Sequence, residues 1–207
     1  SIDEDEFRQQ LKILEHFNFT PITFEDYYLY QNDKLTLPKK PVILTFDDGL
    51  EGVYEIAFPI LKEFNMRAVI FVMGDRTIKK ANWYKGPDGE DCSLITDKQI
   101  LELRSEGFEI GSHGMSHLPL AGMDRELQEY EILKSKKSIE DLLNEEIYTF
   151  SYPYGLLDRI SENVVKEAGY KYGCGVYTGP PRFGANMYDI RRLAIKDNVN
   201  LVSYLFR

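Results

Sequence analysis

The segment 41–49 (PVILTFDDG) constrains this chain most, because an apolar run there ends in two adjacent acids and a glycine. The apolar part predicts a buried strand, and the glycine permits a tight turn directly after it. Asp47 and Asp48 repel each other and lose hydration on burial, so we expect a cation beside them. We interpret that cation as a metal ion whose other ligands lie elsewhere in the chain.

Strand and helix patterns alternate along the whole sequence. After the strand at 41–46, apolar β-rich runs predict strands at 67–73, 108–111, 148–152, 170–177 and 189–195. Helices are predicted at 4–17, 53–64, 96–106, 125–144, 158–168 and 198–206, and polar loops at 76–95 and 178–188. The charges of 125–144 are interpreted as a solvated helix surface. The alternation indicates an α/β fold whose parallel sheet is closed, or nearly closed, into a barrel.

Composition limits the classes of partner. The 207 residues contain no linker rich in Ser, Gly or Pro, which predicts a single domain. A formal net charge of −9 argues against a nucleic-acid partner and against an anionic membrane surface. No run is long enough to span a bilayer. The first residue is Ser1, which is compatible with removal of an upstream leader or anchor. Cys92 and Cys174 are compatible with one disulfide or with two separate buried thiols.

Two of the three histidines, His113 and His117, follow the predicted strand 108–111 with a spacing of four residues. On one turn of helix this spacing would turn both imidazoles the same way. Two histidines and one carboxylate form the three-ligand set of catalytic zinc sites, which keep open positions. A capping or core role is the alternative for a histidine pair of this kind.

Asp48 is the natural third ligand, which leaves Asp47 beside it as a general base. A divalent ion bound there would lower the pKa of a water molecule and polarise a carbonyl oxygen. Zinc is the first choice for two histidines and a carboxylate, and cobalt, nickel or iron suit similar ligands.

Three motifs resemble those of a known family. TFDDG at 45–49, SHGMSH at 112–117 and YPYG at 152–155 are similar, in order and spacing, to the first three motifs of the polysaccharide deacetylases. This family is also called carbohydrate esterase family 4 or the NodB homology domain. The helix and the PITFEDYY segment within residues 1–40 resemble the N-terminal prelude of its poly-N-acetylglucosamine deacetylase branch.

The resemblance implies a single domain over residues 1–207, with 1–40 as a prelude packed on the barrel. It implies a distorted (β/α) barrel of fewer than eight strands, with the site at the C-terminal ends of the parallel strands. The implied activity is metal-dependent hydrolysis of acetyl groups, usually N-acetyl groups on amino sugars. Acetylated glycans of this kind are mostly outside the cytoplasm, so the cell envelope or the extracellular space is the expected location, although some relatives work inside cells.

The family motifs also imply residue roles. Asp47 matches the catalytic base, while Asp48, His113 and His117 match the metal ligands. Tyr154 matches the residue whose backbone N–H binds the oxyanion, and Pro153 and Gly155 would shape that loop against the substrate. Trp83, in the segment 76–95, is a further candidate for sugar contact.

The chain departs from the family pattern at two positions near these motifs. Gly114 replaces the usual Ser or Thr after the first histidine, and Ser116 is a partial substitute for that hydroxyl. Ser151 stands where many members have an arginine that orients the base. We expect Arg192, rather than Arg191, to reach Asp47 instead.

A third departure is that no histidine follows His117, whereas better-known members have a late histidine that protonates the leaving amine. The remaining histidine, His16, is expected on the surface. A missing general acid costs roughly 10²–10⁴-fold in rate. Four explanations stay open. Another group protonates the leaving amine, or Asp47 carries the proton in both directions. Alternatively, the substrate is an O-acetyl ester with a better leaving group, or the general acid lies beyond Arg207.

The function favoured by the sequence is therefore removal of acetyl groups from an N-acetylated glycan by a metal-dependent hydrolase. Two alternatives stay open at this point. One is an O-acetyl esterase acting on a polysaccharide, and the other is a glycan-binding module that keeps the barrel but has little turnover.

Overall fold

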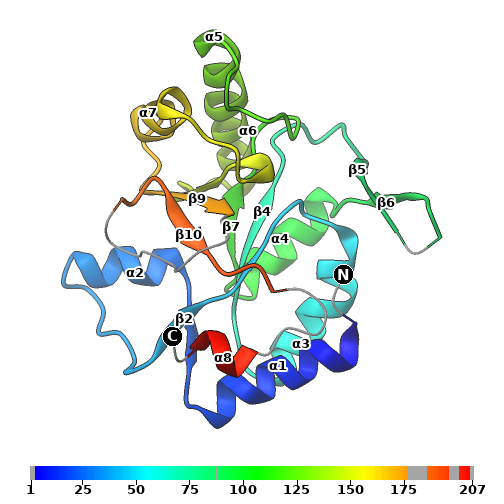
Figure 1. Cartoon of the computed structure of the whole chain (residues 1–207), viewed down its shortest axis with the longest axis vertical. Coiled ribbons are helices and arrows are strands. Elements are labelled where there is room, and N and C mark those ends of the chain that lie inside the picture. Colours follow the sequence, from blue (N-terminus) through cyan, green and yellow to red (C-terminus); the bar gives the residue numbers. More distant parts are fainter. Residues whose placement is uncertain (1–2, 87, 177–185, 196–200, 206–207) are drawn as a thin grey trace.

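A computed structural model describes residues 3–86, 88–176, 186–195 and 201–205. Its described part contains a six-stranded parallel sheet with the order β10-β9-β8-β7-β4-β3, which curls into a half-barrel (Figure 1). The strands are β3 (Thr45–Phe46), β4 (Val69–Val72), β7 (Glu109–Ser112), β8 (Thr149–Ser151), β9 (Tyr172–Val176) and β10 (Ile190–Arg192). The expected distorted α/β barrel with fewer than eight strands is confirmed.

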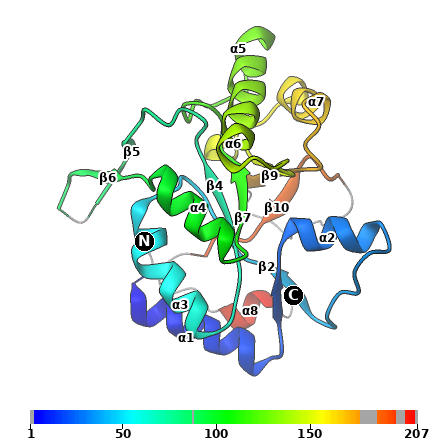
Figure 2. The same cartoon turned by 180° about the vertical axis from the view of Figure 1, so that it is seen from behind.

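Helices cover the outside of this sheet, and α4 and α6 lie in front of β4 and β7 when the molecule is seen from behind (Figure 2). The α-helices are α1 (Glu4–His16), α2 (Phe24–Gln31), α3 (Phe58–Glu63), α4 (Asp97–Ser105), α5 (Arg125–Glu129), α6 (Ser135–Leu143), α7 (Arg159–Glu167) and α8 (Leu201–Leu205). Helices α4 and α6 contact β7, and α7 contacts β9. Strand β4 lies between β7 and β3 and is fully buried, as its unbroken apolar sequence predicts. None of the described helices has the length and apolar character needed to cross a bilayer.

Capping residues explain where several helices begin and end. Thr96 caps α4, because its hydroxyl accepts the Gln99 amide and the Gln99 side chain accepts the Thr96 amide. Asp158 caps α7 in the same way with Ser161. Proline is tolerated at Pro59 because it lies in the first turn of α3, directly after the π-helical turn η1 (Val53–Ala57).

The predicted strand 41–46 is divided in two. Strand β2 (Pro41–Ile43) pairs in parallel with β1 (Thr20–Ile22) in a separate sheet, and only β3 joins the main sheet beside β4. The chain changes neighbours at Leu44, whose carbonyl accepts the Val69 amide at 2.9 Å. A run of apolar residues does not by itself reveal such a change of partner.

The segment 76–95 is not the polar loop expected from its sequence. It contains the antiparallel hairpin β5 (Lys80–Lys85) and β6 (Asp91–Ser93), which extends from the rim of the half-barrel (Figure 1). Ala81 is fully buried with Leu94 and Met73, and this small cluster holds the hairpin in place. Cross-strand pairing and this cluster outweigh the polar composition.

The two cysteines are separate thiols, so the disulfide alternative is wrong. Cys92 lies half-buried in β6, and Cys174 is buried in β9. Residue 177 of the predicted strand 170–177 and residues 178–185 of the predicted loop 178–188 lie outside the described residues. So do 198–200 and 206 of the predicted helix 198–206, and α8 forms the described part of that helix.

The N-terminal segment contacts the sheet through a buried carboxyl group. Glu109 begins β7, and its Oε2 accepts the Glu25 amide at the start of α2 at 2.9 Å. Its Oε1 accepts the Thr149 hydroxyl of β8 at 3.0 Å. Burial and the neighbouring charge of Glu25 raise the pKa of Glu109 to about 8, from an ordinary value of 4.5.

This pKa predicts that the protein loses stability as the pH rises. The folded chain keeps a proton on Glu109 that the unfolded chain releases, so this stabilisation is complete below about pH 4.5 and declines as the pH rises through about 8. We expect the free energy of unfolding to fall from pH 5 to pH 8 more steeply in the native protein than in Glu109→Gln. The difference should be on the order of a few kcal/mol, at about 1.4 kcal/mol per pKa unit. Urea unfolding at both pH values measures it, and equal slopes would contradict the prediction.

Candidate active site

The candidate residues meet at the C-terminal ends of the parallel strands. Asp47 and Asp48 follow β3, His113 follows β7, Ser151 ends β8, and Arg192 ends β10. They meet because the carboxyl ends of parallel strands lie along one edge of a sheet. Gly49 makes the turn after the acids possible. It has a φ of +62°, and a Cβ there would lie 3.2 Å from Cγ1 of Val72.

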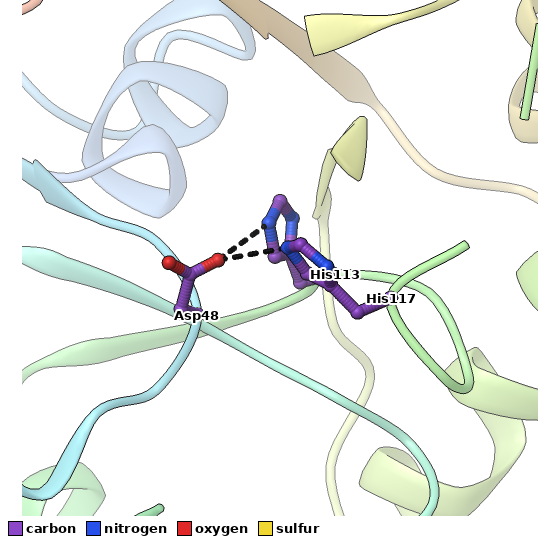
Figure 3. Close-up of side chains that lie close together, drawn as sticks. All are labelled: Asp48, His113 and His117. Atoms are coloured by element: carbon purple, nitrogen blue, oxygen red, sulfur yellow. Dashed lines mark hydrogen bonds and ion pairs between the residues drawn. The ribbon is translucent and has the colours of Figure 1, made fainter. Parts of the chain in front are cut away.

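Asp48 and the two histidines face one another (Figure 3). The Asp48 Oδ1 atom lies 3.0 Å from His117 Nε2 and 3.3 Å from His113 Nε2. Burial disfavours ionisation of Asp48, but the hydrogen bonds and charges of both imidazoles outweigh burial and hold its pKa below the usual range. Asp48 is therefore ionised at neutral pH.

The donor set of this cluster fits a divalent cation. One potential ligand atom from each of Asp48, His113 and His117 lies within 4.8 Å of the other two. Both imidazoles are nearly buried, and Asp48 is partly exposed. Two imidazole nitrogens and one carboxylate oxygen are the ligands of catalytic zinc sites, in which further coordination positions stay open.

The expected helical arrangement of the histidines is wrong. His113 continues from β7, where its amide donates to the Val72 carbonyl at 2.8 Å, and the next residues form a loop. Gly114 and His117 have positive φ angles, +78° and +62°. These two left-handed residues bend the loop so that the second imidazole returns to the first.

The two imidazoles are oriented differently. His113 Nδ1 lies 2.8 Å from the Ser151 carbonyl oxygen, the kind of outer contact that commonly orients a ligand histidine. The His117 ring instead stacks on Trp83 of β5, with centroids 4.0 Å apart and planes 9° apart. Among the described residues, no group pairs with the buried Nδ1 atom of His117. Trp83 therefore lies against the cluster of Asp48, His113 and His117.

Asp47 is held by Arg192, as the sequence predicts. The Arg192 guanidinium donates to both carboxylate oxygens, at 2.8 and 2.7 Å. The Ser151 hydroxyl accepts from Arg192 Nη2 at 2.9 Å and donates to Asp47 Oδ2 at 3.3 Å. The small Ser151 side chain thus leaves room for an arginine arriving from another strand. Arg191 points to the other face of β10, since successive strand residues alternate, and its charge acts on Asp189.

This ion pair sets the charge of Asp47. Burial alone would raise the pKa of Asp47, but the charge and hydrogen bonds of Arg192 outweigh burial and lower the pKa below its ordinary value. Burial opposes the charge of Arg192 in turn, and the Asp47 carboxylate keeps the guanidinium pKa raised. Asp47 is therefore ionised and fixed in direction, as a general base must be.

The YPYG segment forms the 3₁₀ turn η3 (Pro153–Gly155) beside the histidines. The Gly155 and Leu156 amides donate to the carbonyls of Tyr152 and Pro153, and the Tyr154 amide takes no part in these two bonds. Tyr154 has a φ of +59° and is 54% exposed, and its ring is in edge-on contact with the His117 ring, with centroids 4.6 Å apart. The structure thus places Tyr154 at the site expected from the motif.

Sequence reasoning missed Glu131, which lies in the π-helical turn η2 (Tyr130–Lys134) of the helix interpreted as a solvated surface. Glu131 is only 1% exposed and accepts three hydrogen bonds from the loop between the histidines. Gln128, Glu131 and Ser135 are buried on one face of this helix, but they are polar, so apolar periodicity gives no signal for that face. Within the described residues the third histidine, His16, is exposed at the end of α1.

Comparison with known sequences gives one family. Residues 34–173 match the family model described as polysaccharide deacetylase. The chain is 27% identical to the putative polysaccharide deacetylase YxkH of Bacillus subtilis, over 96% of this chain and 67% of that protein. It is 28% identical to the poly-beta-1,6-N-acetyl-D-glucosamine N-deacetylase of Staphylococcus aureus, over 96% of this chain and 69% of that protein.

Solved structures share the fold. The Streptococcus pyogenes deacetylase PplD, in complex with acetate, superposes with a TM-score of 0.86 and 25% identity, over 100% of this chain and 88% of that one. IcaB from Ammonifex degensii has the same fold, with a TM-score of 0.80 and 23% identity over 99% of this chain and 90% of that one. Together with the family match over residues 34–173, the motifs and the fold lead to one conclusion: this chain belongs to the polysaccharide deacetylase family.

Proposed function

We propose that this protein is a metal-dependent hydrolase that removes N-linked acetyl groups from an amino-sugar glycan, with poly-β-1,6-N-acetyl-D-glucosamine as the first candidate. The observation that carries the proposal is an Asp-His-His cluster beside an ionised, arginine-held carboxylate at the strand ends. The S. aureus relative supplies the candidate substrate. A binding module has no need of a free base beside a metal cluster, so these residues favour an enzyme.

Asp48, His113 and His117 would hold the cation, and zinc is the first choice for this donor set, with cobalt, nickel or iron as alternatives. A divalent ion there supplies a water molecule of lowered pKa and a positive charge for the acyl oxygen.

The other residues orient the reactants and move the proton. Asp47 accepts a proton from the attacking water, and Arg192 and Ser151 hold its carboxylate in direction. The Tyr154 amide donates to the acyl oxygen as negative charge develops, a contribution of about 3–4 kcal/mol for one such donor in other enzymes. Asp47, once protonated, returns the proton to the leaving amine. Trp83 and Tyr154 contact the sugar, while Pro153 and Gly155 fix the shape of the turn that carries Tyr154.

Acetate release tests this function. We expect the purified protein to release acetate from oligomers of β-1,6-linked N-acetylglucosamine, to lose this activity with a chelator and to regain it with zinc or cobalt. An acetyl ester of a neutral glycan, assayed in parallel, distinguishes the O-acetyl esterase. Binding of the oligomers with no release from either substrate would contradict the proposed enzyme.

We further propose that residues 1–207 form one domain with the segment 1–40 packed on the half-barrel, and that the protein works in the cell envelope or outside the cell. The stacking of Phe24 on Tyr172, with ring centroids 5.2 Å apart, supports the first proposal. The candidate substrate supports the second. A single cooperative unfolding transition and fractionation of the source cells test them.

A further inference from the structure

Glu131 is a buried carboxylate whose hydrogen bonds, within the part of the chain that the structure describes, come from the loop that carries the histidines. Its Oε2 atom accepts the amides of Met115 and Ser116, both at 2.9 Å, and its Oε1 atom accepts the Ser116 hydroxyl at 2.6 Å. No Lys or Arg within the described part of the chain forms an ion pair with it. A buried carboxylate is costly unless hydrogen bonds replace its hydration, so Glu131 and this loop shape depend on each other.

The loop has a backbone conformation that needs such support. His117 has a φ of +62°, and a left-handed residue other than glycine costs on the order of 1 kcal/mol. The two amides fixed by Glu131 lie directly before it in the chain. At the other end of the loop, a Cβ on Gly114 would lie 3.2 Å from Glu131 Oε2. The carboxylate therefore occupies the space that a side chain at position 114 would need.

The second histidine depends on this support more than the first. The His113 imidazole has an acceptor in the Ser151 carbonyl, whereas Nδ1 of His117 has no partner among the described residues. Apart from its contacts with Asp48 and Tyr154, the direction of the His117 ring is thus set by its stacking on Trp83 and by the backbone before it. Glu131 fixes that backbone.

Glu131 lies in a π-helical turn and faces inward. Turn η2 separates α5 from α6, and π-helical turns of this kind are frequent at functional sites. Ser135, one turn later, accepts the Ser112 hydroxyl at 2.8 Å, next to His113. One face of this helix therefore contacts the chain before His113 and the loop before His117.

From these contacts we infer that Glu131 is a positioning residue of the metal site, which holds the 114–116 loop so that His117 meets Asp48. The inference rests on the metal dependence in the proposed function. It assigns to a carboxylate on the helix the loop-steadying role that a hydroxyl at position 114 would otherwise perform.

A direct measurement of metal affinity, made without an activity assay, tests the inference. Trp83 is the one tryptophan of the sequence and stacks on His117, so paramagnetic Co²⁺ bound at the cluster should quench its fluorescence. We expect Glu131→Gln to weaken Co²⁺ binding to the metal-free protein by roughly 10–100-fold, the usual effect of losing an outer-shell partner. Glu131→Asp should restore part of it.

Glu109→Gln is the matched control. Glu109 is equally buried, accepts an amide and a hydroxyl as Glu131 does, and lies at the opposite end of β7 from His113. Both glutamine variants should lower the melting temperature of the metal-free protein, but only Glu131→Gln should weaken Co²⁺ binding. An equal loss of affinity in the two variants would overturn the inference.

A milder variant covers the case in which Glu131→Gln does not fold. Ser116→Ala removes only the hydroxyl bond to Glu131 and should weaken Co²⁺ binding by about 2–10-fold. Unchanged affinity in Ser116→Ala would overturn the inference, as would unchanged affinity in a folded Glu131→Gln. If the native protein itself binds no Co²⁺, the metal dependence of the proposed function fails together with the inference. If the native protein binds Co²⁺ and the variants bind it with the same affinity, only the inference about Glu131 fails and the proposed metal dependence stands.

Discussion

Asp47→Asn is expected to reduce acetate release by roughly 10²–10⁴-fold, the usual contribution of a positioned general base. Asparagine keeps the shape of the side chain, but its amide cannot accept the proton of the attacking water. The melting temperature should also fall, because the mostly buried Arg192 guanidinium loses its counter-charge and keeps only a hydrogen bond to the amide oxygen. Rates are therefore compared at a temperature at which the variant is folded. Steady-state rates on the N-acetylated oligomer, with and without added metal, give the measurement.

The neighbouring acid provides the comparison. Asp48→Asn should also abolish activity, but it should do so by losing the metal ion, so elemental analysis separates the two variants. Asp47→Asn should retain a stoichiometric metal ion and Asp48→Asn should not. Equal metal content in both variants would contradict the assigned roles. So would residual activity above about 10% in Asp47→Asn, because loss of a general base lowers the rate much further than that.

Arg192→Leu is expected to have the largest effect on stability. It leaves the Asp47 carboxylate mostly buried without its cation, and breaking a buried ion pair typically costs roughly 3–5 kcal/mol. The lower end applies, because the Asp47 side chain retains 24% exposure. Activity should fall as well, since Asp47 loses its bidentate partner and its fixed direction.

The pH profile distinguishes positioning from simple destabilisation. Arg192 lowers the pKa of Asp47 against the effect of burial, so its loss should move the acidic limb of the rate profile to higher pH. Arg191→Leu removes the same charge from the same strand, on the face away from Asp47, and should leave this limb unchanged. Urea unfolding and rate measurements across pH test both variants. Equal effects of the two substitutions would contradict the pairing.

The sequence alone predicted much of the site, because the relevant signals are local. An apolar run that ends in Asp47 and Asp48 marks the end of a strand, and His113 follows the next but one strand of the sheet. Parallel strands place such residues on one edge. Capping residues such as Thr96 likewise define helix starts through contacts three residues apart.

Only the tertiary structure decided the contacts that join distant segments. Arg192 was favoured over Arg191 from a motif, but strand alternation and the space above Ser151 determine which guanidinium reaches Asp47. The stacking of Trp83 on His117 depends on a hairpin whose polar sequence resembles a loop.

The charged sequence of residues 125–144 similarly concealed Glu131, because the side of a helix that is buried depends on what packs against it. Composition and periodicity therefore predicted most of the elements of the main sheet and which end of that sheet carries the acids and histidines. Which side chains from different segments point toward one another was decided by packing and by left-handed backbone positions such as His117. Those depend on atoms far away in the sequence, and no local pattern encodes them.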